Sequence, residues 1–150
     1  MINLLEDLKS YLKNFFSNDK IYKDIKIVEA NLYNNKLESD QITIFIQNEF
    51  EDTRYSTLDN AEINNVAVQF NCYSSQKNID NEKRTSYYMS ALLSDLVSKA
   101  FDKNVLMRAN KNIKGCRKVM TTQPMPLKEG SQIYVTVIRF QLLVEYDYQK

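Results

Sequence analysis

The chain has 150 residues, of which 43% are hydrophobic and 26% charged, and its 20 basic residues nearly balance its 19 acidic ones. This size and composition predict one folded domain over residues 1–150, and two prolines and two glycines exclude collagen-like or low-complexity chains. A net charge of +1 gives no overall electrostatic reason to expect DNA or an acidic membrane as the partner.

Histidine is absent from the chain, which removes the usual general base at neutral pH and the commonest metal ligand. Cys72 and Cys116 are the two cysteines, so cysteine and histidine cannot supply the four ligands of a zinc site. We therefore expect neither an enzyme nor a cofactor. The N-terminal residues lack a basic region, and no window is apolar enough to span a membrane, so we expect synthesis and retention in a reducing cytoplasm.

The first half of the chain predicts one helix followed by three strands. Leu4–Phe16 has an apolar stripe at helical spacing. A strand starts at Ile25 and extends to about Tyr33, before a turn at Asn34–Asn35. Gln41–Gln47 and Val66–Tyr73 alternate as half-buried strands do, and Cys72 falls at an apolar position of the second, where we expect a small buried hydrophobe.

An acidic segment, Asn48–Asn65, separates the last two of these strands. It contains five acidic residues and one arginine, a local charge of −4. Because Phe50, Tyr55 and Leu58 interrupt the polar residues, we interpret the segment as an ordered excursion at a sheet edge rather than a linker.

A second helix is predicted over about Asn81–Phe101, because its apolar residues recur every three to four positions and form a face wide enough to cover a sheet. Asp80 or Asn81 is the predicted N-cap. A basic segment, Lys103–Lys118, follows with six cationic residues and no acidic one, and Gly115 is expected to mark a turn.

The chain ends in two predicted strands. The first covers Arg117–Gln123 and is broken at Pro124–Pro126, because proline cannot continue a central ladder. After a turn at Lys128–Ser131, the last strand covers Ile133–Tyr148. At about 3.3 Å per residue it would reach roughly 50 Å, so we expect a bulge or pairing beyond the domain's own sheet.

The predicted order is therefore α-β-β-β-α-β-β. This order predicts an α+β fold with both helices packed on one face of a twisted, mostly antiparallel sheet.

The strongest functional signal is the opposition of the acidic and basic segments. One interpretation is that the two segments are separate surfaces that only face water. Another is that the basic segment contacts DNA, although it lacks aromatic residues on which bases could stack. A third is head-to-tail association of identical copies into a ring, in which opposite charges supply register. The candidate interface residues are Glu49, Glu51, Asp52, Arg54, Arg108, Lys111, Lys114, Arg117 and Lys118.

Two stretches resemble the tail terminator (tail completion) proteins of tailed bacteriophages and phage-tail-like particles. The first is IFIQNEFEDTRY (Ile44–Tyr55), followed by VAVQFNCYS (Val66–Ser74) before the long helix. The second is MTTQPMP (Met120–Pro126), leading through Gly130 to YVTVIRF (Tyr134–Phe140).

The resemblance implies a structural α+β subunit that forms a hexameric ring on the head-proximal end of the tail tube. There it would stop tube polymerisation and present a surface to the neck or connector. Its partners would be its own copies, the tube protein, the neck or connector protein, and a sheath protein if the tail is contractile. DNA would only pass through the lumen, no membrane would be involved, and assembly would take place in the host cytoplasm.

Three other functions remain open at this point. Within the phage class, the chain could be another neck or head-completion protein. Outside it, the basic segment could make the domain a nucleic-acid-binding module with steeply salt-dependent affinity. A deep apolar pocket with converging polar groups would instead favour a small-molecule-binding or enzymatic domain.

Overall fold

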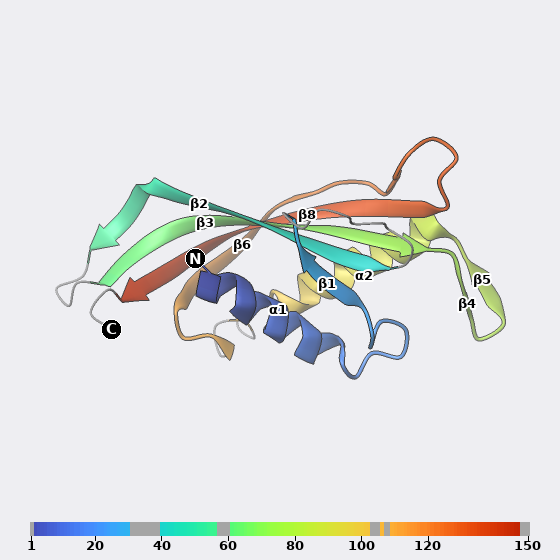
Figure 1. Cartoon of the computed structure of the whole chain (residues 1–150), viewed down its shortest axis with the longest axis horizontal. Helices are drawn as coiled ribbons and strands as arrows, with labels where there is room; N and C mark the ends of the chain where they lie inside the picture. The colour runs from blue at the N-terminus through green and yellow to red at the C-terminus, as the bar shows by residue number, and fades with distance from the viewer. Residues whose placement is uncertain (1, 31–39, 57–60, 103–105, 107–108, 148–150) are drawn as a thin grey trace.

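A computed structural model describes residues 2–30, 40–56, 61–102, 106 and 109–147, with backbone only at 2–3, 48–56, 61–62 and 146–147 (Figure 1). Its elements are, in chain order, α1 (Ile2–Phe16), β1 (Lys26–Glu29), β2 (Gln41–Ser56), β3 (Ala61–Ser75), β4 (Lys77–Ile79), β5 (Glu82–Arg84), α2 (Ser86–Ala100), β6 (Ile113–Thr121), β7 (Met125–Pro126) and β8 (Ile133–Asp147). Helices and a mostly antiparallel sheet confirm the α+β class, while β4, β5 and β7 are short strands absent from the predicted order.

The main sheet has six strands in the order β1-β2-β3-β8-β6, with β7 also paired to β8. β1 runs parallel to β2, and every other pair is antiparallel. β2, β3 and β8 extend along the length of the molecule (Figure 1). β3 and β8 pair without interruption from Ala61 opposite Asp147 to Ser75 opposite Ile133.

One hydrophobic core joins the helices to the sheet. α2 contacts β3 and β8, and α1 contacts β1 and α2. At the centre, the Phe101 ring lies 4.8 Å from the Phe70 ring and 5.0 Å from the Phe140 ring, centroid to centroid. Cys72 is fully buried in this core, as predicted from its strand position.

The last strand does not pair outside its own sheet. β8 lies in the interior, with β3 along one side and β6 and β7 along the other. The irregularities fall in β6 instead, where the register with β8 shifts after Ile113 and again after Lys118. The expectation that β8 bends at a bulge of its own or pairs beyond the domain is therefore wrong, because two partners use its hydrogen-bonding groups.

The acidic segment is not an excursion between strands. β2 continues to Ser56, and β3 already begins at Ala61, so both strands extend well beyond their apolar cores. Thr53 pairs with Asn64 and Ser56 with Glu62, after two register shifts. Residues 57–60 lie outside the described part of the chain.

The second helix begins later than predicted. Residues 82–84 form strand β5, which pairs with β4, and α2 starts at Ser86 with Thr85 as its N-cap. Asp80 and Asn81 adopt positive φ angles of 51° and 66° and form the two-residue turn between β4 and β5. Asn and Asp tolerate this left-handed backbone, which is why they suit a tight hairpin turn as well as a helix cap.

Three further boundaries differ from the sequence prediction. β6 covers Ile113–Thr121, so Gly115 lies inside a strand, at a register shift, and not in a turn. A Cβ at Gly115 would lie 3.2 Å from Leu143 Cδ1, so a larger residue there would require a small shift of the Leu143 side chain. β1 ends at Glu29, and the turn predicted at 34–35 lies outside the described residues. The turn before β8 is confirmed, with Gly130 at a φ of 77°.

Candidate subunit interface

The part of the acidic segment that lies in β2 and the part of the basic segment that lies in β6 are on opposite sides of the main sheet. β1 pairs with β2 only along Gln41–Ile44, so the rest of β2 has no strand on its outer side among the described residues. β6 forms the other edge of the sheet, because its only paired neighbour among the described strands is β8. An edge strand exposes unpaired backbone N–H and C=O groups that can recruit another strand.

Both segments also lie toward the same end of the sheet. In one row across the strands, Asn48 of β2 pairs with Val66, Val66 with Leu142, and Leu142 with Cys116 of β6. The edges are separated by β3 and β8, which corresponds to three inter-strand spacings or roughly 14 Å. The acidic part of β2 and the basic part of β6 therefore flank the same region of one sheet.

The structure places the candidate interface residues unevenly. Glu49, Glu51, Asp52 and Arg54 are all in β2, but their side chains lie outside the described part of the structure. Arg108 is outside the described residues altogether. Lys111 is exposed just before β6, and Lys114, Arg117 and Lys118 are exposed within it.

Two of the basic side chains already have partners in the same chain. Lys114 Nζ lies 3.3 Å from Glu145 Oε2, and Arg117 donates a hydrogen bond of 2.8 Å to Gln141 Oε1. Glu145 offsets part of the Lys114 charge, whereas the neutral amide of Gln141 orients Arg117 without neutralising it. The edge therefore keeps a net positive charge.

A chain of polar side chains on the sheet face turned away from the core was missed by the sequence analysis. Arg139 donates to Gln69 Oε1 at 2.6 Å, Gln69 to Asn71 Oδ1 at 3.0 Å, and Asn71 to the Tyr73 hydroxyl at 3.2 Å. The alternation of polar residues along β3 was the available signal. Phe45 is 39% exposed beside this chain and helps to line a hollow of about 250 Å³ with Gln69 and Arg139.

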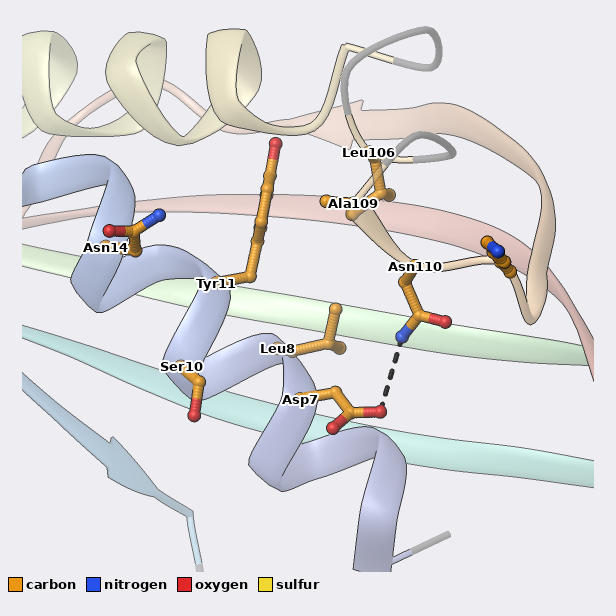
Figure 2. Close-up of a pocket in the computed structure, with 9 residues that line it drawn as sticks. Asp7, Leu8, Ser10, Tyr11, Asn14, Leu106, Ala109 and Asn110 are labelled. Carbon is orange, nitrogen blue, oxygen red and sulfur yellow. Dashed lines mark hydrogen bonds between the residues drawn. The ribbon is translucent and has the colours of Figure 1, made fainter.

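A larger hollow of about 440 Å³ lies between α1 and the segment that leads into β6 (Figure 2). Leu8 and Leu106 contribute apolar surface, and Asp7 lies at the rim, where its Oδ2 accepts a hydrogen bond of 3.3 Å from Asn110 Nδ2. The Tyr11 hydroxyl points away toward α2, where it donates to the Ala100 carbonyl. The described lining also includes the polar side chains of Ser10 and Asn14.

Among the titratable groups with shifted pKa values, Tyr22 and Cys72 lie in the core, and Cys116 packs against it from the edge strand β6. Burial raises the pKa of Tyr22 and of Cys72 well above their usual range, and it raises the pKa of Cys116 to about 11. The thiolate is the reactive form of cysteine, so both thiols are chemically quiet near neutral pH. The two cysteines are not joined in a disulfide.

Within the described ranges, no three Cys, Asp or Glu residues lie close enough together to hold a metal ion. No helix in the described part of the chain has both the length and the apolar character needed to span a membrane. A comparison with models of known protein families found no match, and a comparison with curated protein sequences found none either.

Proposed function

We propose that this chain is a structural virion protein that caps the head-proximal end of a phage tail tube as a ring of identical copies. The ring stops tube polymerisation and provides the surface to which a neck or connector protein attaches. The observation that carries the proposal is the placement of an acidic strand edge and a basic strand edge on opposite sides of one sheet. The resemblance of Ile44–Tyr55 and Met120–Phe140 to tail terminators supports it.

The edge arrangement favours a ring because its two sides differ. A contact between unlike surfaces is heterologous, and repeated heterologous contacts close into a ring when the rotation divides a full turn. Charge complementarity between the two edges would suppress edge pairing between like sides, since like charges repel. We take six as the number of copies from the family resemblance.

In this proposal α1 and α2 cover one face of the sheet. They leave β6 and the outer side of β2 beyond Ile44 available to neighbours, since no described strand pairs there. The tube protein and the neck or connector protein would bind the two ends of the ring, and a sheath protein would bind outside it in a contractile tail. DNA would pass through the lumen without being a ligand. The protein would have no catalytic role and would reside at the head-proximal end of the tail.

Electron microscopy of particles made without this protein tests the proposed function. We expect overlong tubes or tails without heads, because nothing would stop tube growth or join the tube to the neck. Supplying the wild-type chain should restore tails of normal length. Tails of normal length joined to capsids in its absence would contradict the proposal, and tails of normal length without heads would indicate a different neck protein.

A pair of variants links this defect to the basic edge. Lys111→Glu/Lys114→Glu reverses two charges and should fail to restore normal tails, whereas Lys111→Arg/Lys114→Arg keeps the charges and should restore them. Both side chains are exposed, so neither substitution removes packing from the core. Equal rescue by the two variants would show that the basic edge does not contribute to the ring.

A further inference from the structure

We infer that neighbouring copies in the ring are joined by one continuous antiparallel sheet, in which β6 of one copy pairs with the outer edge of β2 beyond Ile44 in the next copy. The inference rests on the proposed function for its partner, a second copy of this chain. It adds that backbone hydrogen bonds make the contact and that opposite charges select the neighbouring edge.

The strand directions fit such a junction. β2, β3, β8 and β6 alternate in direction across the sheet, since each successive pair is antiparallel. β6 therefore runs opposite to β2. In a ring whose axis runs along the strands, the rotation from one subunit to the next does not change the direction of any strand. β6 of one subunit would therefore lie antiparallel to β2 of the next. The alternation would continue unbroken across the boundary.

The backbone groups of β6 are suitably oriented. Thr122 N donates to Val137 O at 2.9 Å, and Glu145 N donates to Asn112 O at 2.7 Å, so the odd-numbered residues of β8 direct their backbone groups toward β6. Residues of an antiparallel strand alternate in the side to which these groups point. Lys118 and Thr121 pair with even-numbered residues, Phe140 and Ile138, and so direct their N–H and C=O groups outward.

The side chains of β6 are also unusual for an edge that faces only water. Val119 is 53% exposed and Met120 38% exposed. Free edges are normally protected by charges, proline or short length, and exposed apolar residues on an edge strand favour pairing with another chain. Lys114, Arg117 and Lys118 supply charges of one sign, which would repel a second β6 and attract an acidic strand.

Charge favours the β2 edge over a second β6 edge as the neighbour. Residues 48–56 contain three acidic residues and one arginine, a charge of −2, whereas Lys114, Arg117 and Lys118 of β6 are all positive. Opposite charges on neighbouring strands are stabilising, and like charges are destabilising. Between Asn48 and Thr53, β2 advances five residues while β3 advances two, so the acidic residues favour the partner without fixing a residue-by-residue register.

A pair of variants at Lys118 separates the contribution of backbone pairing from that of charge. Lys118→Pro removes an outward N–H and the charge, whereas Lys118→Gln removes only the charge. We expect Lys118→Pro to abolish assembly in sedimentation and Lys118→Gln to weaken it less than tenfold, with both variants folded by circular dichroism. Proline is tolerated at an edge position whose N–H faces solvent, so the isolated subunit should stay folded.

Each remaining outcome contradicts the inference. Equal assembly of the two Lys118 variants would exclude backbone pairing at this edge. Loss of assembly in Lys118→Gln as complete as in Lys118→Pro would show that charge alone makes the contact. These failures differ from a failure of the proposed function, because the latter appears as normal tails in particles that lack the protein.

Discussion

Tyr22 connects three parts of the chain through a single hydroxyl. The residue lies between α1 and β1, is 1% exposed, and its hydroxyl lies 2.9 Å from Ser74 Oγ and 3.1 Å from the Met89 carbonyl oxygen. Ser74 in turn donates to Asp40 Oδ1 at 3.0 Å, so its own proton is used there. The phenol proton is therefore shared between Ser74 and Met89, which ties the turn to β3 and α2.

We predict that Tyr22→Phe lowers the free energy of unfolding by about 1–3 kcal/mol, because it leaves the buried Met89 carbonyl without this donor. Urea denaturation at pH 7 measures the loss. Tyr87→Phe is the control, since Tyr87 is 50% exposed and the same change there should stay within about 0.5 kcal/mol. Equal effects of the two substitutions would show that the hydroxyl of Tyr22 does not stabilise the fold.

The difference between wild type and Tyr22→Phe should shrink at alkaline pH. Burial raises the pKa of Tyr22 in the folded protein, with Asp40 adding to the shift, whereas the unfolded phenol ionises near pH 10. The stabilisation is complete below that pH. It is lost as the pH rises above it, because the unfolded state then releases the proton first.

At the scale of the element, the start of α2 depends on one side chain. Thr85 has extended backbone angles, and its Oγ1 accepts a hydrogen bond of 3.2 Å from the Tyr88 N–H. We predict that Thr85→Ala lowers the free energy of unfolding by about 1 kcal/mol and that Thr85→Ser restores most of the loss. Thermal unfolding measures both variants, and no loss in Thr85→Ala would contradict the assignment of the cap.

The sequence predicted that α2 begins at about Asn81, whereas it begins at Ser86, and the difference shows that local patterns do not determine this boundary. The apolar spacing of Met89, Leu93 and Val97 predicted the helix correctly, because each of these residues faces the core. Upstream, the residues are polar and fit a helix end or a hairpin equally well. Pairing of Lys77–Ile79 with Glu82–Arg84 decides between them, and that pairing has no apolar periodicity to predict it.

The same limit applies to the long strands. Apolar alternation predicted β2 and β3 only where one face is buried, around Ile44 and Phe70. Beyond that region, the partner strand determines the conformation, as in the pairing of Thr53 with Asn64. The opposition of charges could be predicted from composition along the chain. The placement of those charges on two edges at one end of the sheet could not, because it depends on strand order.

At the scale of the whole molecule, the opposite charges of the two edges predict which variants assemble alone and which assemble only as a mixture. A chain with Glu49→Lys/Glu51→Lys/Asp52→Lys carries a charge of +2 over residues 48–65 and is basic at both edges. A chain with Lys111→Glu/Lys114→Glu/Arg117→Glu/Lys118→Glu carries a charge of −2 over residues 103–118 and is acidic at both. Each should fail to assemble alone, because like edges repel. An equimolar mixture should assemble, since a basic chain can pair with an acidic chain at both of its edges.

Such a mixture must alternate around the ring, and alternation closes only when the number of subunits is even. A hexamer meets this condition. Sedimentation of each variant and of the mixture should give slow, slow and fast boundaries, and native mass spectrometry of the fast boundary should give three copies of each chain. Added salt should weaken the mixed ring, because exposed charges separated by more than about 8–10 Å are screened at physiological ionic strength. Assembly of either variant alone would mean that these charges do not select the neighbour, and a mixed ring with random composition would mean the same.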